Sequence, residues 1–361
     1  MTLVEQATAA ATPSGGGHPA PQPGRIMVVT DAWKPQVNGV VRTMSTVAGE
    51  LQTMGHQVEV IGPDRFRTIP CPTYPDIRLS VLPGRRLARM IEQFRPDALH
   101  VSTEGPLGLA ARAWARRRGA AFTTAFHTRF PEYINARTGI PVGPIYAWMR
   151  WFHGAGSGVM VATQSLRDDL QARGFRNIKA WTRGVDLGQF QSYQRSDFQD
   201  LPRPVFIYIG RVAVEKNIAA FLDLELPGSK VVVGDGPQLA SLRQSYPDVR
   251  FTGARFGEEL ARSYASADVF VFPSLTDTFG LVILEALACG TPVAAYPVTG
   301  PRDVLAGANG SVGAINSDLR AAALAALQAD RSACRTHAER YAWRACAEKF
   351  VSNLAPIGVS W

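Results

Sequence analysis

The feature that constrains the fold most is an alternation of short apolar runs with helical stretches, which occurs twice along the chain. In the first half, turn residues bound the apolar runs, and the helical stretches end at glycines that can cap a helix. The apolar runs are Ile26–Thr30, Val58–Ile61, Asp97–Val101, Ala121–Phe126 and Gly158–Ala162. The helical stretches are Val41–Met54, Leu107–Arg118 and Gln164–Arg173. Buried strands that alternate with helices predict a parallel α/β sheet.

The alternation restarts after residues 183–204, a polar and aromatic stretch without a clear period. The second set of runs is Pro204–Gly210, Lys230–Gly234, Val249–Thr252, Asp268–Phe272 and Pro292–Tyr296. We therefore expect an α/β protein with two doubly wound domains, which suits a length of 361 residues. The expected parts are a disordered segment 1–23, an N-terminal domain 24–182, a connection 183–204, a C-terminal domain 205–335, and a closing helical segment 336–361 that packs back toward the N-terminal domain.

The composition, with 46% apolar and 19% charged residues, is typical of a globular protein. No apolar run approaches the ~20 residues that span a bilayer, and residues 1–23 lack the apolar core of a secretory signal. We expect a cytoplasmic protein, at most peripheral on the inner face of the membrane. The four cysteines have no CxxC spacing, so neither a zinc site nor a disulfide framework is expected.

The net charge of +8 comes from the first half of the chain. Residues 1–184 carry 22 basic against 12 acidic side chains, whereas residues 185–361 carry 16 against 18. The densest clusters are Arg85, Arg86 and Arg89, then Arg112, Arg116, Arg117 and Arg118. Such clusters suit anionic lipid or phosphorylated ligands, or form a solvated face. Nucleic acid is disfavoured, because no helix-turn-helix, finger spacing or RNP-like strand accompanies the charge.

Paired parallel sheets bind ligands beyond the carboxyl ends of their strands, so candidate residues are sought there. After the first strand, Asn38 and Gly39 offer backbone N–H groups at a helix start, which suits a phosphate or forms an ordinary turn. After the first strand of the second half, Gly210 is followed by Arg211 and Lys216. Two cations there suit a diphosphate leaving group, or form a solvated turn.

The most specific segment runs from Asp277 to Glu285. Asp277 falls in a loop, Phe279 to Leu281 at a helix start, and Glu285 about one turn inside the helix. A loop carboxylate can hold sugar hydroxyls, a helix N-terminus a phosphate, and the glutamate a ribose. The alternative is a capping carboxylate followed by a solvated glutamate.

This segment resembles the retaining glycosyltransferases of family 4, enzymes of the GT-B fold whose mark is a Glu-x7-Glu motif in the C-terminal domain. The resemblance covers most of residues 24–356. It includes Asn38-Gly39, Ala125–Arg129, Arg183–Asp186, Gly210–Asn217 and Gly234–Pro237. Asp277 stands where the family has its first glutamate, which makes this side chain one methylene shorter.

The resemblance implies a role for each matching residue. Catalytic roles fall to His127, Arg211, Lys216 and Asp277. Substrate-binding roles fall to Asn38, Gly39, Gly210, Ala254, Arg255, Phe256, Phe279, Gly280, Leu281 and Glu285. Among these, Arg211 and Lys216 would bind the diphosphate, Glu285 the ribose, and His127 the sugar near its reacting carbon. Ala254, Arg255 and Phe256 would lie against the base.

The implied reaction transfers a hexose from a nucleoside diphosphate sugar to a hydroxyl acceptor, with retention at the anomeric carbon. Neither a metal ion nor another cofactor is expected, because the chain has no Asp-x-Asp metal anchor. UDP is favoured over GDP, because the base segment offers Arg255 and Phe256 where a guanine reader often has a carboxylate. The alternatives are a GDP-mannose-dependent mannosyltransferase, a nucleotide-sugar epimerase or hydrolase of the same fold, and, more remotely, a basic nucleic-acid-binding protein.

The acceptor is expected at the basic N-terminal domain. Four aromatic residues, Tyr146, Trp148, Trp151 and Phe152, fall in a helix expected after Pro144. Arginine clusters beside an aromatic helix suggest docking on an anionic membrane surface, and hence a lipid acceptor. The alternative is that these aromatic side chains belong to the core.

Overall fold

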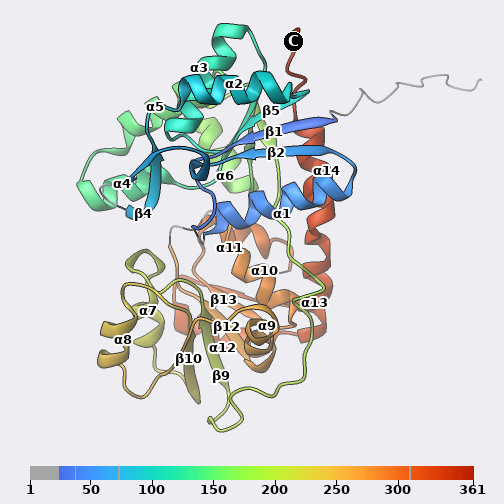
Figure 1. Cartoon of the computed structure of the whole chain (residues 1–361). Helices are drawn as coiled ribbons and strands as arrows, with labels where there is room; N and C mark the ends of the chain where they lie inside the picture. The colour runs from blue at the N-terminus through green and yellow to red at the C-terminus, as the bar shows by residue number, and fades with distance from the viewer. Residues whose placement is uncertain (1–23, 37, 72–73, 276, 278, 309) are drawn as a thin grey trace, which may run out of the picture.

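The computed structural model describes residues 24–36, 38–71, 74–275, 277, 279–308 and 310–361, so the prediction for residues 1–23 lies outside the described residues. Two six-stranded sheets lie one above the other, each covered by helices (Figure 1). The upper unit contains the first half of the chain and the lower unit most of the second. The predicted α/β architecture with two doubly wound sheets is confirmed.

The sheet of the N-terminal unit is parallel, with the order β2-β1-β5-β6-β7-β8. Its strands are β1 (Arg25–Val29), β2 (Gln57–Ile61), β5 (Ala98–Val101), β6 (Thr123–Phe126), β7 (Gly158–Val161) and β8 (Ile178–Ala180). Its helices are α1 (Gly39–Thr53), α2 (Gly84–Phe94), α3 (Pro106–Arg118), α4 (Phe130–Thr138), α5 (Val142–His153) and α6 (Gln164–Ala172). An antiparallel hairpin of β3 (Thr68–Cys71) and β4 (Tyr74–Ser80), absent from the expected pattern, lies outside this sheet.

The sheet of the C-terminal unit is also parallel, with the order β11-β10-β9-β12-β13-β14. Its strands are β9 (Val205–Ile209), β10 (Ser229–Val233), β11 (Arg250–Gly253), β12 (Val269–Phe272), β13 (Val293–Ala295) and β14 (Gly313–Ile315). Its helices are α7 (Ile218–Leu222), α8 (Leu239–Ser245), α9 (Gly257–Ser266), α10 (Leu281–Ala288), α11 (Thr299–Val304), α12 (Leu319–Ala326) and α13 (Arg331–Ala338). Counted from β9, this is the Rossmann strand order 3-2-1-4-5-6, which reverses direction between β9 and β12.

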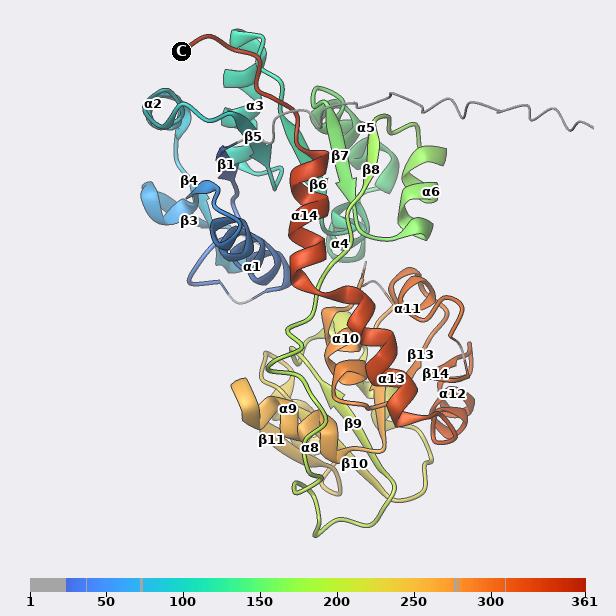
Figure 2. The same cartoon turned by 90° about the vertical axis from the view of Figure 1, so that its right-hand side faces the viewer.

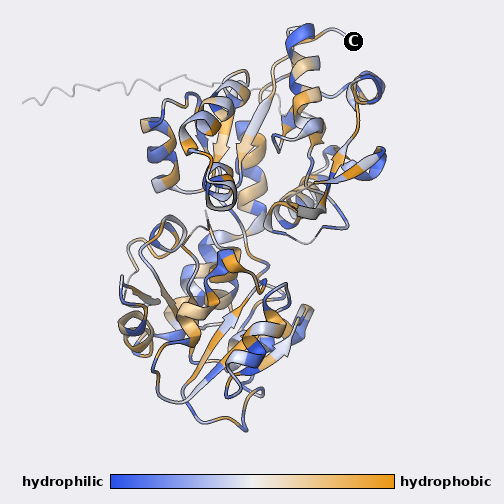
Figure 3. Cartoon of the chain, turned by 90° about the vertical axis from the view of Figure 1, so that its left-hand side faces the viewer, coloured by the Kyte–Doolittle hydropathy of each residue, from blue (hydrophilic) through white to orange (hydrophobic). Residues whose placement is uncertain are grey.

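Both sheets are buried on their two faces. Every residue of β5, β6, β7, β9 and β12 is buried, and hydrophobic residues colour the central strands in Figure 3. Separate hydrophobic clusters fill the two faces of each sheet. Continuous apolar runs in the sequence therefore become central strands, as expected for parallel sheets covered by helices.

The chain passes between the units twice, and the two passages lie side by side. The backbone N–H of Val185 donates to the carbonyl oxygen of Tyr341 at 2.8 Å. Gly184 packs directly on Trp343, where a β-carbon would lie only 2.7 Å from the Trp343 Cα. Beyond this point α14 (Trp343–Asn353) crosses into the N-terminal unit and packs beside α1 (Figure 2).

None of the helices in the described part of the chain is both long enough and apolar enough to cross a membrane.

Candidate active site

Two loops meet at the point where the strand order of the C-terminal sheet reverses. Lys216 lies in the loop after β9 and Asp277 in the loop after β12. The Lys216 Nζ atom is 2.7 and 2.8 Å from the two carboxylate oxygens of Asp277. Burial acts to lower the pKa of Lys216, but Asp277 outweighs it and holds that pKa above its usual range. The lysine is therefore a cation at neutral pH, and two of the predicted residues are in contact.

Gly234 allows the loops after β9 and β10 to touch through their backbones. A β-carbon on Gly234 would lie 1.9 Å from the carbonyl oxygen of Gly210, so only glycine fits. The hydroxyl of Tyr208 donates to the carbonyl oxygen of Arg211 at 2.8 Å and fixes the start of the loop. The side chain of Arg211 is exposed. The loop after β9 thus places Arg211 and Lys216 at the same edge of the sheet.

The N-terminus of α10 begins after a glycine in the left-handed region. Gly280 is the N-cap with φ of 79° and ψ of 73°, a conformation that glycine adopts without strain. Phe279 is buried, with its ring 6.3 Å from that of Tyr341. Of the predicted residues here, Phe279 can offer a ligand only its backbone, whereas Leu281 is half-buried at the first helical position.

Glu285 is enclosed by protein on all sides, with 2% of its surface exposed. Its Oε1 pairs with Arg42 of α1, and its Oε2 accepts a hydrogen bond from the hydroxyl of Tyr264 at 3.0 Å. Burial and the adjacent glutamate raise the pKa of Tyr264, so this hydroxyl stays a donor. Arg42 and Tyr264 were not among the predicted residues. The signal for Arg42 was a lone charge in the apolar first turn of an expected helix.

The N-termini of α1 and α10 meet at this junction between the units. The side-chain oxygen of Asn38 accepts hydrogen bonds from the backbone of Val40 and Val41, both at 3.0 Å, and so caps α1. A β-carbon on Gly39 would be 4.0 Å from Leu281 Cδ1. Since two helix N-termini converge there, the junction favours an anion.

A second polar contact joins the units at α6. Asp303 of α11 accepts hydrogen bonds from the Ser165 backbone N–H at 3.1 Å and from the Ser165 hydroxyl at 3.0 Å. A carboxylate of the C-terminal unit therefore serves the first turn of a helix in the N-terminal unit.

His127 follows β6, at the edge of the N-terminal sheet that faces this junction. Its Nε2 lies 2.9 Å from the hydroxyl of Ser102, and its Nδ1 lies 3.2 Å from Nη2 of Arg183. Burial and then the Arg183 charge hold the pKa of His127 well below its usual range. Arg183 lies in a segment that matches the family but was not among the predicted site residues.

The predicted base segment offers an aromatic face and an arginine that is already bound. The Phe256 side chain is 73% exposed, and Ala254 is also exposed. The guanidinium of Arg255 contacts Asp197 and the Ser263 hydroxyl, the latter at 2.7 Å. Contact of these residues with a base stays a prediction.

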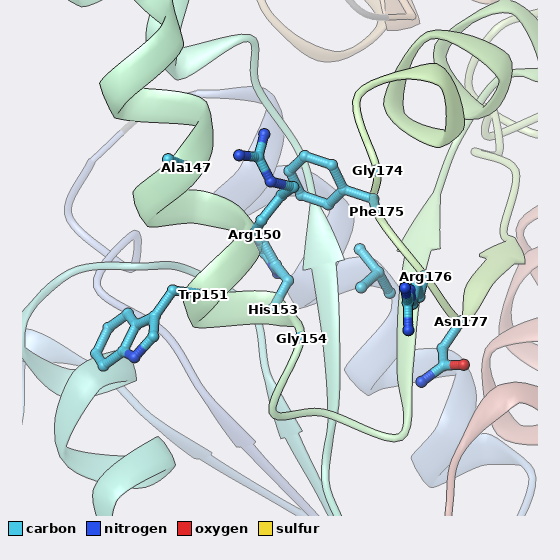
Figure 4. A pocket seen from close by; sticks show the side chains of 10 residues that line it. Ala147, Arg150, Trp151, His153, Gly154, Gly174, Phe175, Arg176 and Asn177 are labelled. Atoms are coloured by element: carbon cyan, nitrogen blue, oxygen red, sulfur yellow. The ribbon is translucent and has the colours of Figure 1, made fainter.

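Two described hollows lie at the edges of the sheets away from these residues. One, of about 670 Å³, is lined by Arg150, Phe175 and Asn177 at the amino ends of β7 and β8 (Figure 4). The other lies beside the amino ends of β10 and β11, next to Ser229 and Arg250. Neither contains a predicted site residue.

The aromatic helix α5 is divided between core and surface. Tyr146 and Phe152 are buried, whereas Trp151 is 53% exposed. The Arg112 guanidinium lies 3.6 Å from the centre of the Trp151 ring. The expectation of an aromatic face for membranes therefore does not hold for Tyr146 and Phe152, because their rings fill the core beside β6 and β7.

Among the described residues, no group of three or more histidine, cysteine, aspartate or glutamate side chains is placed to hold a metal ion.

Comparison with known proteins matches both halves of the chain. Residues 37–189 match the model of Glycosyltransferase Family 4, and residues 203–330 match that of Glycosyl transferases group 1. The chain is 32% identical over 307 residues to a GDP-mannose-dependent alpha-mannosyltransferase of Mycobacterium tuberculosis, covering 78% of this chain and 81% of the relative. It is 28% identical to the alpha-monoglucosyldiacylglycerol synthase of Streptococcus pneumoniae, covering 75% of this chain and 71% of the relative.

The fold is also similar to that of solved glycosyltransferase structures. Sucrose-phosphate synthase from Thermosynechococcus elongatus superimposes with a TM-score of 0.71 over 90% of this chain and 97% of the other, at 20% identity. Both sheets have the strand arrangement expected of this fold, and the matches cover both halves of the chain. The chain therefore belongs to glycosyltransferase family 4 and is a glycosyltransferase with the GT-B fold.

Proposed function

We propose that this glycosyltransferase moves a hexose from a nucleoside diphosphate sugar to a lipid hydroxyl, with retention at the anomeric carbon and without a metal ion. The observation that carries the proposal is the contact of Lys216 with Asp277 at the strand-order reversal, four residues before α10 begins. A lysine ammonium has three N–H donors. Since Asp277 takes two of them, one is left for a phosphate oxygen.

The chemistry follows from this arrangement of charges. The bond between the anomeric carbon and the β-phosphate oxygen breaks, and negative charge grows on the departing diphosphate. Lys216, Arg211 and the backbone N–H groups at the start of α10 stabilise that charge. The acceptor oxygen bonds to the same face of the anomeric carbon, and its proton passes to the departing phosphate oxygen. Asp277 holds hydroxyls of the transferred sugar.

GDP-mannose is the donor that we propose. The relative from Mycobacterium tuberculosis is a GDP-mannose-dependent enzyme. The expectation of UDP depended on Arg255 and Phe256 standing where a guanine reader often has a carboxylate. The Arg255 guanidinium is bound to Asp197 and Ser263, so it gives little support to either base. The exposed Phe256 ring offers a flat face on which a purine can stack.

The acceptor that we propose is a lipid reached at an anionic membrane surface. The relative from Streptococcus pneumoniae is a synthase of a glycosylated diacylglycerol. On this chain, the buried Arg112 of α3 donates hydrogen bonds to the backbone carbonyls of Trp151 and Phe152 and so joins α3 to the helix with the exposed Trp151 ring. Arg116, Arg117 and Arg118 follow at the end of α3 and are exposed. Basic side chains beside an exposed tryptophan suit the headgroup region of an anionic bilayer.

The test is a transfer assay on the full chain with GDP-mannose, UDP-glucose and UDP-galactose, and diacylglycerol in vesicles with and without anionic lipid. We expect a mannolipid from GDP-mannose, formed faster on anionic vesicles. Asp277→Asn should abolish most of the product, whereas Asp248→Asn, at an exposed position on the far edge, should not. Turnover of the donor that does not depend on any acceptor would contradict transfer, and product from UDP sugars alone would contradict the donor.

A further inference from the structure

Arg183 is a buried cation without an acidic partner in the described part of the chain. It is 5% exposed, and none of its contacts there is an ion pair. Its Nη1 donates to the carbonyl oxygens of Trp181 and Thr182, at 3.2 and 3.1 Å. Its guanidinium carbon lies 4.3 Å from the centre of the Trp181 ring. Burying an arginine in this way costs free energy, which suggests that Arg183 has a function.

The remaining contact of Arg183 determines the tautomer of His127. A guanidinium carries only donors. The Nη2 of Arg183, 3.2 Å from Nδ1 of His127, therefore donates to that nitrogen, which must be unprotonated. The ring proton then sits on Nε2, which donates to the hydroxyl of Ser102 at 2.9 Å. Both ring nitrogens thus have a defined role.

The groups around His127 also keep the ring uncharged. Arg183 faces it from the connection after β8, His100 from β5 and His153 from α5. Glu104, a nearby carboxylate, lies 3.1 Å from His153 and is paired with that residue. Arg183 stays charged at neutral pH, because burial lowers the pKa of its guanidinium only to about 10. A fixed positive charge therefore stands beside the ring.

We propose that Arg183 is a positioning residue that holds His127 as the neutral tautomer with its proton on Nε2. This inference rests on the proposed function, in which His127 lies near the reacting sugar. In that place the ring offers a sugar hydroxyl one N–H donor, which turns from Ser102 to the substrate. It offers no basic nitrogen, so it does not compete with the departing phosphate for the acceptor proton.

The test reads the tautomer directly, by nitrogen NMR of the full chain labelled at histidine, without substrate. His127→Gln assigns the signal. In the wild type we expect Nδ1 of His127 to be unprotonated and the ring not to titrate between about pH 8 and about pH 5.5, across the usual histidine pKa. A ring protonated at Nδ1, or one that titrates in this range, would overturn the inference.

Two variants link the tautomer to catalysis. In Arg183→Met, Nδ1 of His127 loses its donor, so the ring should become a mixture of tautomers. Its pKa should rise, although burial still holds it below the usual value, and kcat should fall more steeply toward about pH 5.5 than in the wild type. Arg183→Lys keeps a cation that only donates, so it should restore the Nε2 tautomer and the flat pH profile. If Arg183→Met does not fold, the wild type and Arg183→Lys still decide the matter.

The outcomes separate this inference from the proposed function. The NMR result needs no substrate, so it stands even if no donor is turned over. Transfer with normal pH dependence in Arg183→Met, or an unchanged tautomer in that variant, would remove the role of Arg183 and leave the transferase activity intact.

Discussion

The two sides of the junction hold a cation in opposite ways. In the C-terminal unit, Lys216 is neutralised by Asp277. In the N-terminal unit, the described partners of Arg183 are two carbonyl oxygens, a histidine nitrogen and the Trp181 ring, and none of them is acidic. In the proposed function, the first arrangement keeps a neutralised cation that a diphosphate can share. The second leaves its charge uncompensated and uses it to control a neighbouring ring. Two sheets of similar architecture therefore place a cation in different electrostatic environments.

One ion pair belongs to both sides. Arg42 comes from α1 of the N-terminal unit, and Glu285 from α10 of the C-terminal unit. Its presence means that the buried carboxylate on the donor side depends on the opposite unit for its counter-charge. In the proposed function, a donor whose ribose binds Glu285 would share that carboxylate with Arg42. Such sharing would couple donor binding to the distance between the units.

The largest effect is expected from removing the cation on the C-terminal side. Lys216→Met should lower kcat by about 10²- to 10³-fold, because a donor aimed at charge that develops in the transition state is lost. Steady-state kinetics measure kcat and KM separately. Lys349→Met, on the exposed face of α14, is the matched control and should behave as the wild type. A rise in KM with unchanged kcat would instead mean that Lys216 binds substrate and transition state equally.

A smaller effect is expected from breaking the pair that joins the two sides. Arg42→Met leaves the Glu285 carboxylate buried with Tyr264 as its described partner. Removing one member of a fully buried pair costs ~3–5 kcal/mol. Because the Arg42 side chain is 38% exposed, solvent reduces the loss to ~1–3 kcal/mol of unfolding free energy, measured by urea titration.

Two further variants sharpen this result. In the double variant Arg42→Met/Glu285→Gln no charge is left buried, so part of the stability should return. Arg344→Met breaks an exposed pair with Glu348 and should cost less than ~0.5 kcal/mol. If Arg42→Met costs no more than this control, the two units do not share the carboxylate as described.

The smallest effect concerns the histidines of the N-terminal side. Burial lowers the pKa of His100 from 6.5 to about 3, so the unfolded chain takes up a proton that the folded chain refuses. Its stabilising contribution is complete above the unfolded pKa and is lost as the pH falls below it. Between about pH 7 and about pH 5.5 the loss is ~1 kcal/mol. His100→Gln should flatten that loss in urea titrations, whereas the less buried His56→Gln should follow the wild type. Equal slopes in both variants would contradict the assignment.

Local patterns were enough to predict most of the strands. The runs ending at Thr30, Phe126 and Gly210 became β1, β6 and β9, with boundaries that moved by one or two residues. Short apolar runs bounded by turn residues usually form the central strands of a sheet that is covered on both faces. The β3–β4 hairpin was not predicted, because its strands contain Pro70 and Pro75 and proline is unfavourable within a strand.

What the sequence determined by itself was therefore the class of fold, the family, and which loops carry Lys216, Asp277 and His127, because these follow from periodicity and from residues close together in the chain. Only the tertiary structure decided their partners. Arg42 and Glu285 are 243 residues apart, and His127 and Arg183 are 56 apart. Such pairs form because the carboxyl ends of parallel strands collect distant loops at one edge, and because α14 carries the end of the chain back across to the first unit. No local pattern records which side chains will meet there.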